Sequence, residues 1–139
     1  MTHDIDLCNW LMDGVPVVSD SSVKTVRSDQ FDMAQGTLSY EGGRIATLTA
    51  SRVADEGRRV MDIYYPNGLV SIDFNAKTLT NHTPFDLNED FADHPDVKDS
   101  LAAGLNEFVL AIIEKRRPFI GAEDGLNAVE VAVRIDEGT

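Results

Sequence analysis

The stretch FDMAQGTLSYEGGRIATLTASR, residues 31–52, decides how this chain of 139 residues folds. Its two halves, Phe31–Tyr40 and Arg44–Arg52, contain the β-branched, aromatic and small residues that are typical of strands. Between them, Glu41–Gly43 is a short glycine-rich turn of the kind that joins antiparallel strands. Small and β-branched residues occupy both faces of the second half, which indicates that helices cover one face and something else covers the other.

Strand patterns continue on both sides of this hairpin. The sequence predicts further strands at Val17–Arg27, Arg58–Tyr65, Leu69–Phe74 and Lys77–Asn81. Asn67 and Gly68 supply the positive φ angles that a tight hairpin turn needs. Consecutive strands joined by short turns predict an open, predominantly antiparallel sheet of five to six or more strands.

Helical periodicity is found at the two ends of the chain. A short amphipathic helix is expected over residues 2–11, because its apolar side chains cannot all be solvated cheaply: Ile5, Cys8, Trp10 and Leu11. A stronger helix is predicted from Val97 to Arg117, and a last one opens at Gly121. The residues of this last helix expected to face inward are Leu126, Val129 and Val133, with Val131 and Ala132 beside them.

Segregated strands and helices indicate the α+β class, with the helices packed on one face of the open sheet. The length predicts that residues 1–139 form a single domain. The other face of the sheet carries apolar side chains that need a partner, most simply a second copy of the chain: Ile45, Val60, Tyr64 and Leu69. We therefore expect a homo-oligomer that associates through the β-sheet.

The charge and the cysteine content exclude several classes of function. A net charge of −12 and a pI near 4.4 argue against nucleic acid and anionic membranes as partners, since phosphate binding needs clustered cations. The single cysteine, Cys8, excludes an internal disulfide and fits a reducing compartment. Without a membrane-spanning run or a signal-peptide pattern, the sequence predicts a cytoplasmic protein.

Motifs for catalysis or metal binding are sparse: there is no glycine-rich phosphate loop, no G-x-S-x-G elbow and no paired metal-ligand spacing. Arg52, Arg58 and Arg59 could hold an anion together, but pairing with nearby acids is the favoured interpretation: Asp55, Glu56 and Asp62. Residues 83–99 form an acidic loop that is expected to be solvated; a metal site there is a minor alternative, because no calcium-loop spacing is present. His82 and His94 are predicted to be surface residues.

His3 lies at the start of the expected first helix, beside Asp4 and Asp6. An imidazole in this position is useful to an active site because it titrates near neutral pH. Composition alone favours another interpretation, in which Thr2 or Asp4 caps the helix and His3 is an exposed terminal residue.

Four segments in order resemble the C-terminal domain of the Gfo/Idh/MocA (glucose–fructose oxidoreductase, inositol dehydrogenase and MocA-like) family. They are HDIDL at 3–7, GTLSYEGGRIATLTASR at 36–52, GLVSID at 68–73, and LNEFVLAI at 105–112 with RPFIGAEDG at 117–125. The resemblance implies an α+β domain whose open sheet forms subunit contacts. It also implies an N-terminal Rossmann domain that binds NAD or NADP, with a sugar, cyclitol or nucleotide sugar between the two domains.

By this resemblance His3 matches the active-site histidine, which acts in proton transfer, and Asp6 matches an orienting carboxylate; Asp4 has the weaker match. Oxidation of an alcohol requires loss of the hydroxyl proton, in agreement with this role. The family's aspartate four residues before the histidine would fall before Met1. Its cofactor-site lysine belongs to the missing Rossmann domain, so we expect this chain alone to bind neither NAD nor NADP.

The sequence therefore predicts the substrate-side and oligomerisation domain of an NAD(P)-dependent oxidoreductase, inactive by itself. The alternative is a non-catalytic binding or assembly module that keeps the fold and dimerises through its sheet.

Overall fold

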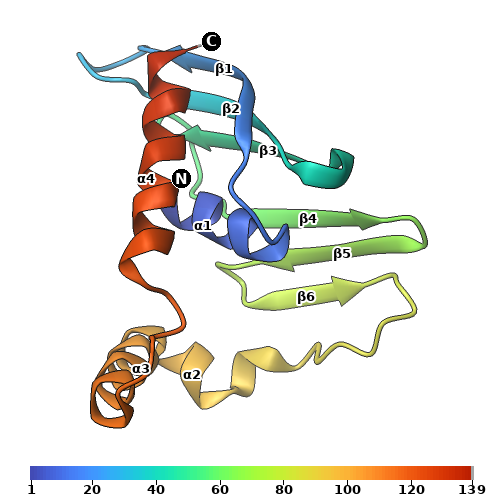
Figure 1. Cartoon of the computed structure of the whole chain (residues 1–139). Coiled ribbons are helices and arrows are strands. Elements are labelled where there is room, and N and C mark those ends of the chain that lie inside the picture. Colours follow the sequence, from blue (N-terminus) through green and yellow to red (C-terminus); the bar gives the residue numbers. More distant parts are fainter. Residues whose placement is uncertain (139) are drawn as a thin grey trace. The chain divides into compact units, whose positions relative to one another are not determined.

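The computed structural model describes residues 1–138 and divides into two compact units. The first unit combines Met1–Asp55 with the segment that starts at Phe119, and the second consists of Glu56–Pro118. Figure 1 shows the elements of both units in the colours of the sequence. Among residues 1–138, no helix combines the length and the apolar composition that crossing a membrane requires.

An antiparallel three-stranded sheet, in the order β1-β2-β3, forms the first unit's framework. Its strands are β1 (Val17–Lys24), β2 (Met33–Ser39) and β3 (Ile45–Ser51). The predicted hairpin is confirmed, with Leu38 opposite Ala46 and a single 3-10 turn, η1 (Glu41–Gly43), between the strands. Gly42 and Gly43 have φ angles of 75° and 76°, a conformation that glycine adopts without strain.

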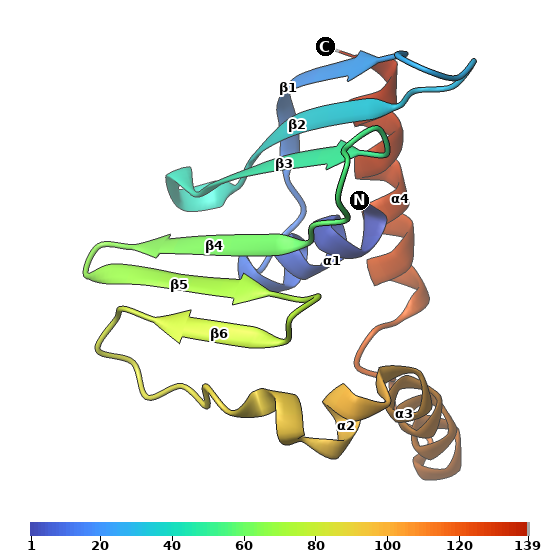
Figure 2. The same ribbon diagram turned by 180° about the vertical axis from the view of Figure 1, so that it is seen from behind.

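Two helices pack in the first unit. Helix α4 (Ala122–Glu137) lies against β1 and β2, and α1 (Thr2–Leu11) lies against α4 and β3, as Figure 2 shows from behind. The helix α4 approaches the sheet at Gly36, where a β-carbon would lie 2.7 Å from Cδ1 of Ile135. A glycine at this point of β2 therefore lets the helix and the sheet meet closely.

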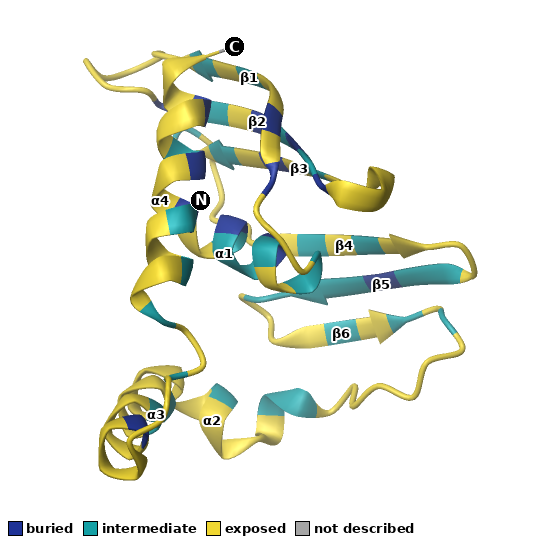
Figure 3. Cartoon of the chain, viewed as in Figure 1, coloured by how far each residue is buried: buried dark blue, intermediate teal, exposed yellow. Residues whose placement is uncertain are grey.

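The buried residues in Figure 3 identify which helix faces are turned inward. The largest completely buried side chains are Ile5, Leu38, Val131 and Ile135. Two expectations about this core are wrong. Trp10 is 76% exposed, and three residues of α4 that were expected to face inward are exposed: Leu126, Val129 and Val133. Of the two residues expected beside them, Val131 is buried and Ala132 is half-buried, as predicted. Helix α4 is apolar on two sides, and the contact with Gly36 selects the side that carries Ile135.

A second antiparallel sheet, in the order β4-β5-β6, forms part of the other unit. Its strands are β4 (Val60–Tyr65), β5 (Gly68–Asp73) and β6 (Thr78–Asn81). Register places apolar side chains together on one face: Met61, Ile63, Val70, Ile72 and Leu79. A side chain at Gly68, whose φ is 151°, would collide with the carbonyl oxygen of His82.

All six predicted strands are present, but the prediction of one sheet with five or more strands is wrong. The strands form two three-stranded sheets, so each sheet is smaller than expected. The segment between β3 and β4, residues 52–59, is longer than a hairpin turn, as is the segment between the paired strands β1 and β2, residues 25–32. Such a connection does not force the strands that it joins to pair.

The second unit ends in helices that differ from the prediction. After η2 (Phe91–Asp93), the expected continuous helix is divided into α2 (Pro95–Lys98) and α3 (Ser100–Glu114). Asp99 causes the break because its side chain accepts a hydrogen bond from the Ala102 amide at 3.0 Å, as an N-cap does. The prediction that helices pack on one face of a sheet is confirmed for α4 in the first unit. In the second unit, the main neighbour of α3 is the short helix α2 and not the sheet.

Candidate functional site

Helix α1 carries the candidate catalytic residues of the first unit. Ile5 and Cys8 are buried against α4 and β3, which fixes the rotation of the helix. Successive residues turn by about 100° around a helix axis, so His3, Asp6 and Trp10 lie on the opposite side, away from this core. Of these three side chains, His3 and Trp10 are exposed and Asp6 is half-buried.

The structure brings His3 and Asp6 together as i and i+3 neighbours on one face of α1. Neither side chain forms a hydrogen bond or an ion pair within residues 1–138, so both are available to a ligand. The N-cap of α1 is Met1, which means that Thr2 and Asp4 lie within the helix and do not cap it.

Asp4 is placed differently from the other two candidates. Its carboxylate lies 3.6 Å from the amino group of Met1, and its charge acts on Cys8, four residues further along α1. Burial, followed by the charge of Asp4, raises the pKa of the Cys8 thiol. Cys8 therefore stays protonated and acts as a small apolar residue of the core.

A partly buried hydrogen bond anchors the far end of α1. The hydroxyl of Tyr40 donates to Oδ1 of Asn9 at 2.9 Å, and this tyrosine follows β2 directly. Burial raises the pKa of Tyr40, with a smaller contribution from Cys8, so its hydroxyl keeps the proton that it donates. The His3 face of α1 is thus held by apolar packing at Ile5 and by a polar contact at Asn9.

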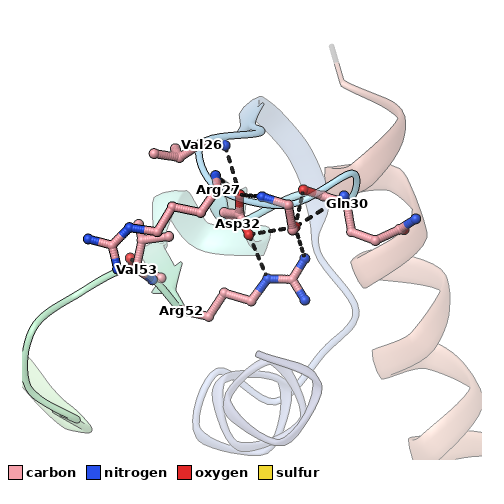
Figure 4. Close-up of polar contacts among 8 residues, drawn as sticks. Val26, Arg27, Gln30, Asp32, Arg52 and Val53 are labelled. Carbon is pink, nitrogen blue, oxygen red and sulfur yellow. Dashed lines mark hydrogen bonds and ion pairs between the residues drawn. The ribbon is translucent and has the colours of Figure 1, made fainter.

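A second polar cluster surrounds Asp32 in the loop between β1 and β2 (Figure 4). Oδ2 of Asp32 accepts hydrogen bonds from the amides of Val26, Arg27 and Ser28 at 2.7, 2.6 and 3.0 Å. These three backbone donors, the Arg27 amide foremost, hold the pKa of Asp32 far below its usual range. Oδ1 accepts from Ser28 Oγ at 2.8 Å and from Arg52 Nε at 3.0 Å.

The contacts of Asp32 indicate a structural role. Its carboxylate is almost fully enclosed by partners from its own loop and from Arg52 at the end of β3. An open hollow of about 460 Å³ lies beside this cluster, and its lining includes Arg52 and Asp136. Since its lining combines the guanidinium of Arg52 with the carboxylates of Asp32 and Asp136, its charge favours no one kind of ion, and we assign no ligand to it.

Two of the three arginines of the sequence analysis, Arg52 and Arg59, have different partners. Arg52 pairs with Asp32, an acid outside the set of expected partners. Arg59 lies over the ring of Phe74, 4.7 Å from its centre, within the second unit. Asp62, one of the expected partners, instead accepts a hydrogen bond from Ser71 Oγ at 2.5 Å.

The acidic segment at residues 83–99 has exposed carboxylates and contains η2 and α2. His94 Nδ1 accepts a hydrogen bond from the Asp96 amide and caps α2, so this histidine has a local partner that the sequence analysis did not foresee. His82 is exposed, as expected. Within residues 1–138, no group of three or more histidine, cysteine, aspartate or glutamate side chains is arranged to hold a metal ion.

The described residues do not fit a dinucleotide cofactor. A Rossmann site needs parallel strands with a helix between them and a glycine-rich turn at the helix start. All strand pairs within residues 1–138 are antiparallel, and no such turn precedes a helix.

Asp32 is the residue that the sequence analysis missed. The predicted hairpin already contained the signal, because Met33 pairs with Ser51 and the next pair outward is Asp32 with Arg52. Opposite charges directly across an antiparallel pair stabilise it.

Comparison with known proteins identifies the fold's relatives. Residues 1–71 match the family described as GFO/IDH/MocA C-terminal domain. The UDP-N-acetylglucosamine 3-dehydrogenase of Acidithiobacillus ferrooxidans is 30% identical over 142 residues, which cover 97% of this chain and 45% of that protein. The chain thus spans less than half the length of this relative.

Solved structures give the same result. The A. ferrooxidans enzyme superposes with a TM-score of 0.82 at 29% identity, over 99% of this chain and 44% of that one. The WlbA dehydrogenase from Bordetella pertussis, in complex with NADH and UDP-GlcNAcA, shares the fold with a TM-score of 0.78 at 13% identity, over 98% of this chain and 43% of that one. From the sequence match and the shared fold, we conclude that this chain belongs to the GFO/IDH/MocA C-terminal domain family.

Proposed function

We propose that residues 1–139 are the substrate-side and oligomerisation domain of an NAD(P)-dependent oxidoreductase that acts on a hydroxyl of a sugar, cyclitol or nucleotide sugar. The observation that carries this proposal is the match of nearly the whole chain to 45% of a UDP-N-acetylglucosamine 3-dehydrogenase. The exposed face of α1, with an imidazole and a carboxylate one turn apart, supports it.

In this proposal His3 accepts the proton of the hydroxyl that is oxidised. An imidazole suits this role because it exchanges a proton near neutral pH, and its exposure lets a substrate approach within hydrogen-bond distance. Asp6 orients the imidazole or the substrate from the next turn of the same helix face. Asp4, which faces Cys8, has no direct part in the chemistry.

NAD or NADP would be bound by a Rossmann domain outside this chain, and we expect the chain alone to bind neither. The complete protein would be a homo-oligomer associated through its β-sheets. In support, the outer faces of the two sheets each carry exposed apolar side chains, among them Ile45 on β3 and Tyr64 on β4. We expect a cytoplasmic location, in keeping with the single, buried and unpaired Cys8.

The test joins this chain to the part of the A. ferrooxidans enzyme that it does not match. The fusion should reduce NAD(P) in the presence of UDP-N-acetylglucosamine or a related nucleotide sugar, whereas this chain alone should not. His3→Ala should lower kcat by about 10²- to 10⁴-fold, the usual contribution of general acid–base catalysis, without changing NADH affinity.

His82→Ala is the matched control, because it removes an exposed histidine from the second unit and should leave turnover unchanged. Full turnover in the His3→Ala fusion would refute the role of His3. A folded fusion that binds NADH but oxidises no sugar, cyclitol or nucleotide sugar would favour the non-catalytic module.

A further inference from the structure

A polar contact ties helix α1 to the residue that follows β2. The hydroxyl of Tyr40 donates to Oδ1 of Asn9 at 2.9 Å, and Tyr40 is only 6% exposed. Both residues are also held through their backbones, because the Tyr40 amide donates to the carbonyl oxygen of Arg44 and the Gly14 amide donates to that of Asn9. The contact therefore joins two fixed points, the last turn of α1 and the start of the turn between β2 and β3.

The side chain of Asn9 is only half satisfied by this contact. Its Nδ2 is buried and has no hydrogen-bond partner within residues 1–138. A buried donor without a partner typically costs more free energy than one neutral hydrogen bond contributes. An apolar residue of similar volume would therefore hold α1 at least as firmly, so stability alone does not explain an asparagine at this position.

The geometry of α1 gives the contact a second role. Ile5 and Cys8 determine which side of the helix faces the core, but apolar packing is non-directional and permits small slides of the helix. At about 100° per residue, Asn9 lies about 40° from Ile5 around the axis, and Cys8 lies about 60° from Ile5 on the other side. Because a hydrogen bond has a preferred length and direction, the contact at Asn9 sets the position and the fine rotation of the helix beside these apolar contacts.

His3 is carried by the same helix. Six residues separate it from Asn9, roughly 9 Å along the axis, and Ile5 lies between them. If α1 tilted about Ile5, a shift of about 1 Å at Asn9 would move His3 by about 0.5 Å, because His3 is half as far from this pivot. A slide along the axis would reach His3 undiminished. Displacements of this size are enough to impair a catalytic group.

We infer that Asn9 and Tyr40 are positioning residues, whose hydrogen bond sets the place of the His3 imidazole through helix α1. This inference rests on the proposed function, in which His3 accepts the proton of the substrate hydroxyl. Asn9 and Tyr40 act without touching the substrate, and all the contacts concerned lie within the first unit.

The test replaces both partners by apolar side chains of similar shape, in the double variant Asn9→Leu/Tyr40→Phe. Such a paired replacement is nearly neutral or stabilising, so the urea concentration that half-unfolds the full chain should not fall. In the fusion to the unmatched part of the A. ferrooxidans enzyme, kcat should nevertheless fall at least ~10-fold, with the affinity for NADH unchanged. A lower urea midpoint would make the pair a structural contact and overturn the inference, as would a wild-type kcat.

Tyr64→Phe is the control, because it also removes one hydroxyl and keeps the ring, but on an exposed tyrosine of the second unit. It should change neither the urea midpoint nor kcat.

The dependence on His3 separates positioning from support of the fold. If the pair acts through the imidazole, the double variant should lower kcat at least ~10-fold when His3 is present, and by less than ~2-fold when His3→Ala is already in place. Equal losses in the two backgrounds would overturn the inference, because the pair would then act independently of His3.

A measurement on the full chain alone keeps this inference apart from the proposed function. Residual dipolar couplings of the backbone amides report how α1 is oriented in the first unit. In the double variant they should change for residues 2–11 and stay the same for β2, residues 33–39. Unchanged couplings in α1 would overturn the inference with or without turnover. Changed couplings, in a chain whose fusion oxidises no sugar-like substrate, would remove the proposed activity and keep the pair as the residues that position α1.

Discussion

Replacement of Gly36 by alanine should destabilise the first unit, although the change adds only a methyl group. The new β-carbon would lie 2.7 Å from Cδ1 and 2.8 Å from Cγ1 of Ile135, where ordinary contact begins at 3.4 Å. The side chain of Ile135 would have to retreat by 0.7 Å, the difference between 3.4 and 2.7 Å, and it is completely buried.

Overpacking of this kind costs about 1–3 kcal/mol. Alanine restricts the unfolded chain more than glycine does and returns about 0.4–1 kcal/mol, so the net loss should be roughly 1–2 kcal/mol. With a urea dependence of about 1–3 kcal/mol per molar, the unfolding midpoint should fall by about 1 M. Hydrogen exchange of the β2 amides reports this loss for the first unit specifically.

Gly125→Ala is the matched control, because a β-carbon there meets nothing within 4 Å and lies in the helix that packs over Gly36. It should stabilise the first unit by about 0.5–1 kcal/mol. The double variant Gly36→Ala/Ile135→Ala should lose less free energy of unfolding than the two single variants lose together, by at least ~1 kcal/mol, because the shortened side chain at 135 removes the collision. Additive losses, or a Gly36→Ala variant as stable as the wild type, would refute the close-approach argument.

Three further outcomes are expected. Because folding lowers the pKa of Asp32, this carboxylate stabilises the first unit fully above the ordinary pKa of 3.8, and the stabilisation is lost as the pH falls through the lower folded-state pKa. In urea titrations at decreasing pH, the free energy of unfolding of Asp32→Asn should therefore fall less steeply than that of the wild type. Gly68→Ala should lower the free energy of unfolding of the second unit by ~1–3 kcal/mol, because its β-carbon would collide with the backbone of His82. Hydrogen exchange of the β5 amides measures this loss, and Gly57→Ala, whose β-carbon meets nothing within 4 Å, should leave the stability unchanged. Light scattering should detect self-association that Tyr64→Glu weakens; a strictly monomeric wild type would contradict the sheet interface.

Local signals were sufficient to predict the strands. Turns such as Glu41–Gly43 and Pro66–Gly68 punctuate the sequence, and alternation between them fixes each strand to within a few residues. The number of sheets could not be predicted in this way, because residues 52–59 contain turn-forming residues without the two-residue geometry that dictates pairing. Strand pairing across such a segment depends on tertiary packing.

The helices show where periodicity fails. Helix α4 has two apolar sides, and a sequence pattern cannot choose between Val133 and Ile135 without the position of Gly36 on the sheet. On α1, the same pattern placed Trp10 in the core, whereas the structure turns it outward on the face that carries His3. The candidate site itself was found through family resemblance, and its exposure on α1 is what the structure adds.

The first unit is assembled from the two ends of the chain, with the first helix packed on the last. During synthesis, residues 56–118 leave the ribosome as one contiguous piece and can pair their strands while the unit around them is still incomplete. The helix that carries His3 is translated before this piece, yet it gains its packing partner α4 only when residues 122–137 have been translated after it. Such a large sequence separation slows folding, because a long loop must close before the contact is gained. We therefore expect the candidate active-site helix to be translated before residues 56–118 and to become ordered after them.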